Sequence, residues 1–369
     1  MSQINTNAIL DASGGTTTSI NGYTPTASNM AGRNRIINGD MRIDQRNAGA
    51  SVTGNSVYSV DRFYQVNNVV GCTYSVQQDS SAPQGFTNSL KVTITAAASP
   101  VGNTQVSFRQ YIEGFNTADL NWGTANAKTV TLSFWVKSSL TGTFGGAISN
   151  NAFDRLYAYE YTINSANTWE YKTVTIAGDT TGTWETGNSA GMRVYFGLGA
   201  TNYSKAAGVW GSAFAVQSTG SVDLCATNGA TWQITGVQLE AGSVATPFEH
   251  RQYGQELALC QRYYQRTKRT GDATTCIGNG HIYNSLTAYS VYNFKQTMRS
   301  APTGNASASS DLGILSAGAN YVSSSTHFQA ANEDQIEIVL SGLSGAPTGN
   351  GGWVRLQTNN SWIDFSAEL

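Results

Sequence analysis

Residues 231–265 read TWQITGVQLEAGSVATPFEHRQYGQELALCQRYYQ, and this stretch changes its hydrophobic period partway along. In its first part, apolar side chains alternate with polar ones at Trp232, Ile234 and Val237, with a register break near Gly236. A period of two is typical of a β-strand that buries one face. We therefore expect this part to be a strand that closes a β-sandwich.

The second part of the same stretch has a helical period. Its apolar stripe recurs at spacings of four, three and four residues and consists of Tyr253, Leu257, Cys260 and Tyr264. This spacing predicts a helix over residues 249–266. A helix of about four turns is marginal in isolation. The stripe must therefore pack either against its own sandwich or against further copies of the chain.

Upstream of this stretch, strand patterns dominate residues 51–248. Alternating apolar positions are Leu90, Val92 and Ile94; Val106 and Phe108; Leu132, Phe134 and Val136; Val174 and Ile176; and Met192, Val194, Phe196 and Leu198. Turns rich in Gly, Asn and Thr separate them. Eight or more short strands of this kind indicate a jelly roll or a related sandwich. Strands do not alternate with long helices, which argues against an α/β fold.

The composition fits an all-β protein that hydrogen-bonds through its surface. Of the 369 residues only 12% are charged, against roughly 25% in ordinary globular proteins. The net charge of -2 gives no basis for binding nucleic acid, and no apolar run is long enough to insert into a membrane. The N-terminus lacks the features of a signal peptide. Low charge also suits burial of the surface in an assembly.

Four segments resemble a known family. They are RNRIINGDMRIDQRNAG at 33–49, YSVDRF at 58–63, VQLEAGSVATPFEHRQYGQELALCQRYYQ at 237–265 and the closing IDFSAEL at 363–369. Together they resemble bacteriophage tail fibre and receptor-binding proteins. The resemblance covers most of residues 33–265 and the last strand. It implies a virion-attachment segment, then a jelly-roll module similar to carbohydrate-binding modules, then a β-rich tip.

The expected organisation is an all-β chain in four parts. These are an extended N-terminal virion-attachment arm (1–50), a carbohydrate-binding-module-like jelly-roll sandwich (51–248), a short helical connector (249–272) and a smaller C-terminal β-rich tip domain (273–369). In the tip we expect strands at 336–343, 353–358 and 362–369, and a long polar loop that begins at Ser300. The resemblance favours a homotrimer, in which Tyr253, Leu257, Cys260 and Tyr264 form the oligomer interface.

Arginines gather in the last part of the expected arm, around the turn Asn38-Gly39-Asp40. They are Arg33, Arg35, Arg42 and Arg46. They could belong to a solvated linker. The alternative is that they anchor the arm by pairing with carboxylates on other virion tail proteins, since the guanidinium fork suits interfaces.

Aromatic side chains supply the candidate glycan-binding residues. Trp135 and Tyr195 fall on the strand face opposite the apolar positions, and Trp169, Trp184 and Trp210 fall in or beside loops. Aromatic rings stack on sugar rings, and binding residues concentrate on loops. Trp184 is the strongest candidate. Tyr157, Tyr159 and Tyr161 share one strand face and fit a core or a subunit interface better than a glycan platform.

Nothing in the sequence indicates catalysis, a cofactor or a metal. The histidines have no metal-ligand spacing, and hydrolase and nucleotide-binding motifs are missing. A polysaccharide depolymerase would need only two carboxylates, which Asp154, Glu160, Glu170, Asp179 and Glu185 could supply. Asp61 and Glu240 could brace a calcium ion, but no spaced acidic loop supports this. The four cysteines lack CxxC spacing, and Cys260 is expected to be a small buried hydrophobe.

The function that fits best is adhesion. We expect a phage tail fibre or receptor-binding protein that attaches the virion to a host surface polysaccharide or lipopolysaccharide. It would be assembled in the host cytoplasm and reside on the phage tail. A purely structural virion component, such as a tail adaptor, decoration or capsid-fibre subunit, is the alternative.

Overall fold

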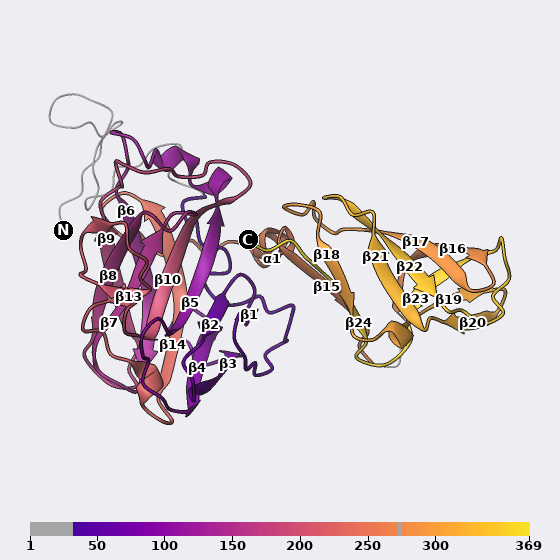
Figure 1. Ribbon diagram of the computed structural model, residues 1–369, viewed down its shortest axis with the longest axis horizontal. Coiled ribbons are helices and arrows are strands. Elements are labelled where there is room, and N and C mark those ends of the chain that lie inside the picture. Colours follow the sequence, from indigo (N-terminus) through magenta and orange to yellow (C-terminus); the bar gives the residue numbers. More distant parts are fainter. Residues whose placement is uncertain (1–31, 272–274) are drawn as a thin grey trace, which may run out of the picture. The chain divides into compact units, whose positions relative to one another are not determined.

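The computed structural model describes residues 32–271 and 275–369. The chain divides between Arg251 and Gln252 into two compact units, each built almost entirely of β-strands (Figure 1). This confirms the all-β fold class. In the part of the chain that is described, no helix is both long and apolar enough to cross a lipid bilayer.

The first unit is a jelly-roll-type sandwich of two antiparallel sheets (Figure 1). One sheet has the strand order β1-β2-β5-β10-β7-β8-β12 and the other β3-β4-β14-β6-β9. The bounds are β1 (Val57–Tyr58), β2 (Tyr64–Asn67), β3 (Thr73–Asp79), β4 (Ser89–Ala96), β5 (Gln105–Glu113), β6 (Val130–Ser138), β7 (Gly142–Ser149), β8 (Leu156–Ile163), β9 (Glu170–Ile176), β10 (Ala190–Ala200), β12 (Trp210–Gly211) and β14 (Thr231–Ala241). Smaller elements are a parallel pair, β11 (Ser204–Lys205) with β13 (Gln217–Ser218), and the 3-10 turns η1 (Gly114–Asn116), η2 (Ala118–Leu120) and η3 (Leu224–Ala226).

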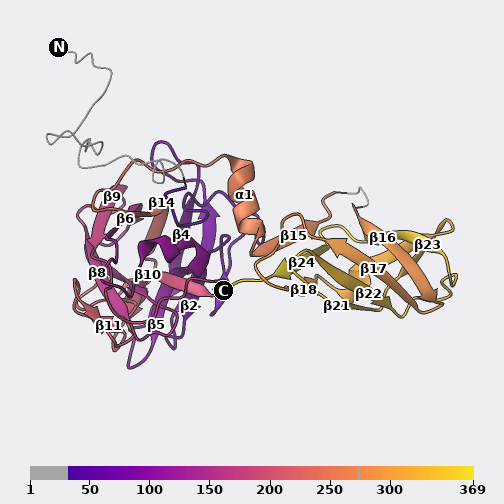
Figure 2. The same cartoon turned by 90° about the horizontal axis from the view of Figure 1, so that it is seen from above.

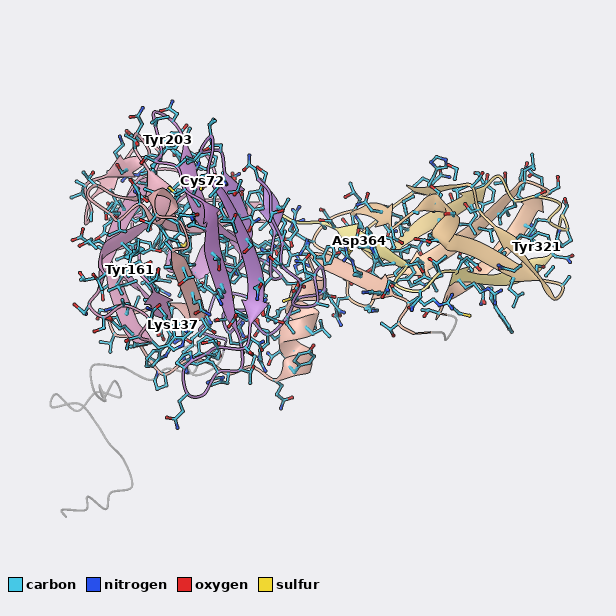
Figure 3. The ribbon with its side chains drawn as sticks, turned by 90° about the horizontal axis from the view of Figure 1, so that it is seen from below. Cys72, Lys137, Tyr161, Tyr203, Tyr321 and Asp364 are labelled. Atoms are coloured by element: carbon cyan, nitrogen blue, oxygen red, sulfur yellow. The ribbon has the colours of Figure 1, made fainter. Side chains whose placement is uncertain are left out.

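The core between the two sheets consists of the side chains that the alternation predicted. Phe134 and Val136 on β6, Phe196 on β10 and Trp232 on β14 are all at most 1% exposed. Tyr159 and Tyr161 on β8 are buried as well, and the Tyr159 hydroxyl donates a hydrogen bond of 2.6 Å to the Tyr195 carbonyl oxygen (Tyr161 is labelled in Figure 3). The prediction that these tyrosines pack in the core is confirmed for Tyr159 and Tyr161, whereas Tyr157 is partly buried against the same core.

The segment 33–50 is part of this sandwich, which corrects the expected boundary of the N-terminal arm. Ile36, Met41 and Ile43 are at most 1% exposed. The amide of Ile37 donates to the Gln110 side-chain oxygen at 2.8 Å, and the Gln110 amide returns a bond to the Ile37 carbonyl oxygen. Burial of three large apolar side chains holds the segment in place. The rest of the arm, residues 1–31, lies outside the described residues.

The four arginines proposed as a virion anchor have partners within their own chain. Arg35 makes a two-point ion pair with Asp119, at 2.7 and 2.8 Å. Arg33 lies 3.8 Å from the Glu240 carboxylate, Arg42 pairs with Asp40, and Arg46 lies 3.7 Å from Asp61. The carboxylates that these guanidinium groups require are therefore local. That these arginines meet carboxylates of another tail protein stays a prediction.

The second unit contains the helix α1 (Tyr253–Gln261) and two antiparallel sheets (Figure 2). The sheet orders are β15-β24-β18 and β20-β19-β23-β16-β17-β22-β21. The bounds are β15 (Tyr264–Lys268), β16 (Thr275–Asn284), β17 (Thr287–Asn293), β18 (Thr303–Ala306), the 3-10 turn η4 (Ser309–Asp311), β19 (Leu312–Ser316), β20 (Ala319–Val322), β21 (Ser325–Gln329), β22 (Gln335–Ser341), β23 (Gly351–Leu356) and β24 (Trp362–Ser366). The three strands predicted from the sequence correspond to β22, β23 and β24, whereas the expected polar loop contains β18 and η4.

The helix is shorter than predicted and belongs to the second unit. Tyr264 begins strand β15, where it pairs with Ser366, and its hydroxyl donates to the Asp364 carboxylate at 2.6 Å. Tyr264 and Cys260 are 3% and 0% exposed, so neither is available to another subunit. The predicted interface is wrong for these two residues, while Cys260 is the buried hydrophobe that was expected. Tyr253 is 57% exposed and Leu257 is partly exposed.

Candidate functional site

An aromatic groove lies on the outer face of the five-stranded sheet of the first unit. Trp135 follows the buried Phe134 on β6 and therefore points away from the core. Its register partner on β9 is Tyr171, and the two ring centroids are 5.4 Å apart with an angle of 49° between their planes. Tyr171 is 43% exposed. The sequence correctly placed Trp135 on the outward face.

Three further aromatic rings complete the groove. The Phe86 centroid lies 5.2 Å from that of Phe248 and 5.4 Å from that of His250, and the last two are 4.9 Å apart. Phe86 comes from the loop between β3 and β4, whereas Phe248 and His250 follow β14. Segments far apart in the sequence therefore meet beside Trp135.

Gly236 makes this arrangement possible. Strand β14 changes register against β6 between Thr235 and Gln238, which confirms the break expected near this glycine. Its φ is +62°, and a Cβ atom there would lie 2.7 Å from the Phe86 ring and 3.2 Å from the Trp135 ring. Glycine is favoured at positive φ, and only a residue without a side chain leaves room for both rings.

The groove is open and mainly apolar, with a volume of about 390 Å³. Besides the aromatic rings, its lining includes Gln84 and Ser133. Pockets that bind small ligands commonly combine apolar and aromatic walls with a few polar groups. A sugar ring likewise combines apolar and polar parts, because its faces carry C–H groups and its edge carries hydroxyls. The lining can therefore stack a sugar and hydrogen-bond its edge.

The same sheet face carries a second indole, that of Trp169, which lies beside Lys137 of β6. Lys137 on β6 places its ammonium 5.0 Å from the centroid of Trp169 and donates a 2.8 Å hydrogen bond to the Ser81 hydroxyl (Lys137 is labelled in Figure 3). Burial lowers the pKa of Lys137, and Lys91 lowers it further while Asp79 opposes the shift. Trp169, a predicted candidate, is half-buried and adds a cation–π contact to this face.

Tyr195 is not available to a ligand, which corrects the prediction. It does lie on the outward side of β10, but its side chain is 0% exposed. It packs in a small cluster with Ala215, Val216 and Phe214, which come from the segment between β12 and β13. This segment covers that part of the seven-stranded sheet.

Trp184 and Trp210 form a packing cluster with Trp122. The Trp184 centroid is 4.7 Å from that of Trp122 and 5.7 Å from that of Trp210, in both cases edge to face. Both indole N–H groups donate to backbone carbonyl oxygens, at Thr181 and Ala177. The two half-buried rings thus brace loops against the core. The structure brings them to each other and does not place them in the groove beside Trp135.

The acidic residues considered for catalysis include two that are held as salt-bridged anions. Burial would raise the pKa of Glu170, but hydrogen bonds from Lys172, Ser165 and Asn164 lower it to about 2. Burial likewise opposes the shift at Asp179, where the 2.6 Å pair with Arg155 lowers the pKa. A glycosidase needs one carboxyl with a raised pKa as its general acid. The pKa values of Glu170 and Asp179 are instead lowered.

Asp61 and Glu240, the candidate calcium ligands, accept hydrogen bonds from their own chain. Asp61 accepts from the backbone and side-chain amides of Gln45. Glu240 accepts from the amide and hydroxyl of Thr246 and from the Gln238 side chain. Within residues 32–271 and 275–369, no three His, Cys, Asp or Glu side chains gather as a metal site would require.

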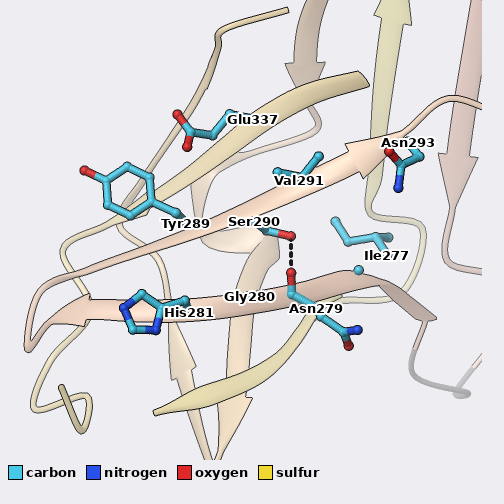
Figure 4. Close-up of a pocket in the computed structure, with 10 residues that line it drawn as sticks. Ile277, Asn279, Gly280, His281, Tyr289, Ser290, Val291, Asn293 and Glu337 are labelled. Atoms are coloured by element: carbon cyan, nitrogen blue, oxygen red, sulfur yellow. Dashed lines mark hydrogen bonds between the residues drawn. The ribbon is translucent and has the colours of Figure 1, made fainter. Parts of the chain in front are cut away.

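The second unit has a hollow of its own, of about 600 Å³, over strands β16 and β17 (Figure 4). Asn279 and His281 on β16 border it, together with Tyr289 and Val291 on β17 and Glu337 on β22. The Ser290 hydroxyl donates to the Asn279 carbonyl oxygen at 2.8 Å (Figure 4). Sequence patterns did not single out these residues, and the lining of the hollow contains two aromatic rings, those of His281 and Tyr289.

No protein-family model matches the sequence, and no curated protein does so either. Among solved structures, the enzymatically active domain of tailspike protein 4 from bacteriophage CBA120 is 13% identical with a TM-score of 0.28. The match covers 56% of this chain and 21% of that domain, so the chain spans about a fifth of the tailspike domain's length.

Two further solved structures are matched over almost their whole length. A putative sugar-binding protein from Bacteroides thetaiotaomicron is 11% identical with a TM-score of 0.33, over 57% of this chain and 100% of that one. The family 11 carbohydrate-binding module from Clostridium thermocellum is 11% identical with a TM-score of 0.25, over 54% and 98%. At these scores the likeness is confined to fold class and carries no information on the ligand of this chain.

Proposed function

We propose that this protein is an attachment protein of a bacteriophage tail and that it binds a host surface polysaccharide or lipopolysaccharide. The observation that carries the proposal is the groove of Trp135, Tyr171, Phe86, Phe248 and His250. The sequence resemblance to tail fibre and receptor-binding proteins supports the phage setting. The net charge of -2 gives no support for a nucleic acid as the ligand.

The groove supports sugar binding because its lining combines aromatic rings with polar side chains. The Trp135 and Tyr171 rings offer a broad apolar surface on a rigid sheet, and Gln84 lies in the same lining. Aromatic side chains keep few rotatable bonds, so little conformational entropy is lost on binding. Each contact of this kind is weak. Several copies of the groove on one particle would multiply the effect through their effective concentration.

Several copies require an assembly, and we propose the homotrimer as that assembly. Its support is the family resemblance and the exposure of Tyr253, since Cys260 and Tyr264 are buried within the chain. Attachment to other virion tail proteins is proposed for the arm, residues 1–31. The protein would be assembled in the host cytoplasm and carried on the phage tail.

We propose adhesion without catalysis. The pKa values of Glu170 and Asp179 are lowered, which does not suit a general acid. A depolymerase would release reducing ends from its polysaccharide. A colorimetric assay for reducing ends on incubation with the bound polysaccharide tests this, and no release is expected.

Adsorption to bacterial cells tests the proposed function. Purified full-length protein should bind cells of a susceptible strain, and soluble polysaccharide from that strain should displace it and reduce phage adsorption. A well-folded protein that binds no strain of a broad panel would instead favour the purely structural virion component.

A further inference from the structure

Arginine and tyrosine side chains alternate across the outer face of the seven-stranded sheet, on the side of the sandwich opposite the groove. The register pairs Tyr58 with Tyr64, Tyr64 with Arg109, and Arg109 with Tyr195 across four neighbouring strands. In the next row, Arg193 on β10 is paired with Tyr111 on β5. Cross-strand partners lie on one face of a sheet, so these side chains form one surface cluster.

Arg109 lies at the centre of this cluster. Its guanidinium carbon is 4.8 Å from the ring centroid of Tyr64, 5.1 Å from that of Tyr111 and 5.5 Å from that of Tyr195. Stacking on aromatic faces fixes the plane of the guanidinium and leaves its N–H edges free to donate. Arg109 is only half-buried, and so are Tyr64 and Tyr111. The cation is therefore reachable from solvent.

Neither arginine has a carboxylate partner among the described residues. Arg193 donates to the carbonyl oxygens of Asn150 and Asn151 and to the Asn151 side chain, which are all neutral. The Arg109 side chain makes no hydrogen bond to any described group, and its Nε is buried without an acceptor. Burial lowers the pKa of Arg193, and the charge of Arg109 contributes in the same direction. Two cations thus share one face without a counter-charge.

Several other half-buried arginines do have a carboxylate partner, although Arg355 has only the Asn320 side chain. Arg35 pairs with Asp119, Arg155 with Asp179, and Arg266 with Asp364. Burying a cation is unfavourable unless it is paired. The Arg109 face lacks that compensation, and an anion from outside the chain would supply it.

We propose that Arg109, framed by Tyr64, Tyr111 and Tyr195, binds the anionic group of an acidic saccharide, a sugar carboxylate or phosphate. This inference rests on the proposed glycan-binding function and adds a second, charge-selective site to it. A guanidinium edge matches the two oxygens of a carboxylate or phosphate. The half-exposed tyrosine rings can contact the sugar that carries the anion. One reachable cation suits one charge per repeat unit, whereas a nucleic acid requires several.

Titration of the full-length protein with a matched pair of probes tests the proposal. Trigalacturonate carries carboxylates, and its methyl ester keeps the sugar and removes the charge. We expect the acid to bind about tenfold more tightly than the ester at low ionic strength, which is typical of one hydrogen-bonded charge. The advantage should shrink as salt is added. Glucose 1-phosphate compared with glucose tests whether phosphate serves as well as carboxylate.

Variants assign the effect to Arg109. Arg109→Gln should abolish the preference for the acid, and Arg109→Lys should keep part of it. Lys128→Gln removes an exposed cation elsewhere on the same unit and should leave the preference intact. Circular dichroism checks that each variant is folded. A native protein without preference for the acid over its ester, or a preference that survives in Arg109→Gln, would overturn the proposal.

The same titrations separate this inference from the proposed function. Trp135→Ala lies on the opposite sheet and should weaken binding of a neutral host glycan without removing the preference for the acid. If the groove binds glycan but no charge preference is found, the proposed function stands and the anion site fails. If no glycan of either kind binds, both fail.

Discussion

Trp135 and Tyr171 occupy directly paired positions on β6 and β9, and their ring centroids are 5.4 Å apart on the outer face of the sandwich. The sheet itself sets this spacing, because cross-strand partners lie roughly 5 Å apart. Backbone hydrogen bonds therefore fix the two rings relative to each other. The part of the groove formed by these two rings is therefore preorganised by the sheet.

Gly236→Ala tests whether the bulge of β14 builds the groove. The substitution adds a methyl group at positive φ and drives it against Phe86. We expect the unfolding free energy to fall by about 1–3 kcal/mol and glycan affinity to fall with it. Gly229→Ala is the control, because that glycine also has positive φ but has open space around it. Equal loss of glycan affinity in the two variants would contradict this role.

Ile36→Ala tests whether segment 33–50 belongs to the sandwich. The side chain is 1% exposed, and its truncation should cost roughly 2–5 kcal/mol because a cavity remains. Denaturant unfolding gives the value directly. Ser51→Ala, at an exposed position, should stay within about 0.5 kcal/mol. An unchanged midpoint for Ile36→Ala would mean that the segment is a detachable arm after all.

Asp179→Asn should change how stability depends on pH. The folded pKa of Asp179 is lowered, so its contribution is complete above the unfolded value of about 3.9 and is lost as the pH falls through the folded value. We expect the variant to be about 1–3 kcal/mol less stable at neutral pH. The two stability curves should converge in acid. Asp119→Asn, at an exposed pair, should lose less than about 1 kcal/mol, and parallel curves for Asp179→Asn would refute the assignment.

Tyr253→Glu tests the proposed trimer. Tyr253 is 57% exposed at the start of α1, and a charge there would be unfavourable in an apolar contact between subunits. Light scattering of the native protein should give three times the chain mass of 39.2 kDa, and the variant should shift toward one chain mass. If the native protein is monomeric at all concentrations, the proposed trimer is contradicted.

The strand pattern of the first unit was predictable because the signal is local. Leu132, Phe134 and Val136 alternate within one strand, and all three are buried. The glycine that interrupts the alternation at Gly236 marks the bulge for the same reason. Local periodicity also explains the error at Tyr264. Its spacing from Cys260 fits a helix, but its partner strand β24 begins 98 residues later, at Trp362. A pattern within neighbouring residues does not reveal a pairing with so distant a segment.

The site was only partly predictable, because alternation tells which face a side chain points to and not what covers that face. Trp135 and Tyr195 have the same pattern, yet Trp135 borders an open groove and Tyr195 lies beneath Phe214 and Val216. Phe86, Phe248 and His250 were missed because they come from two segments, before β4 and after β14, that meet beside Trp135 only in the folded chain. The unpaired state of Arg109 is likewise visible only once its neighbours in space are known.

The most direct measurement of the central claim is the affinity of the full-length protein for purified surface polysaccharide from a strain whose cells it binds. Trp135→Ala should weaken this affinity roughly thirtyfold, the effect of losing about 2 kcal/mol at a well-packed aromatic contact. Trp353→Ala, which removes an exposed indole from the second unit, should leave it unchanged. Unaltered affinity in a folded Trp135→Ala variant would contradict the account.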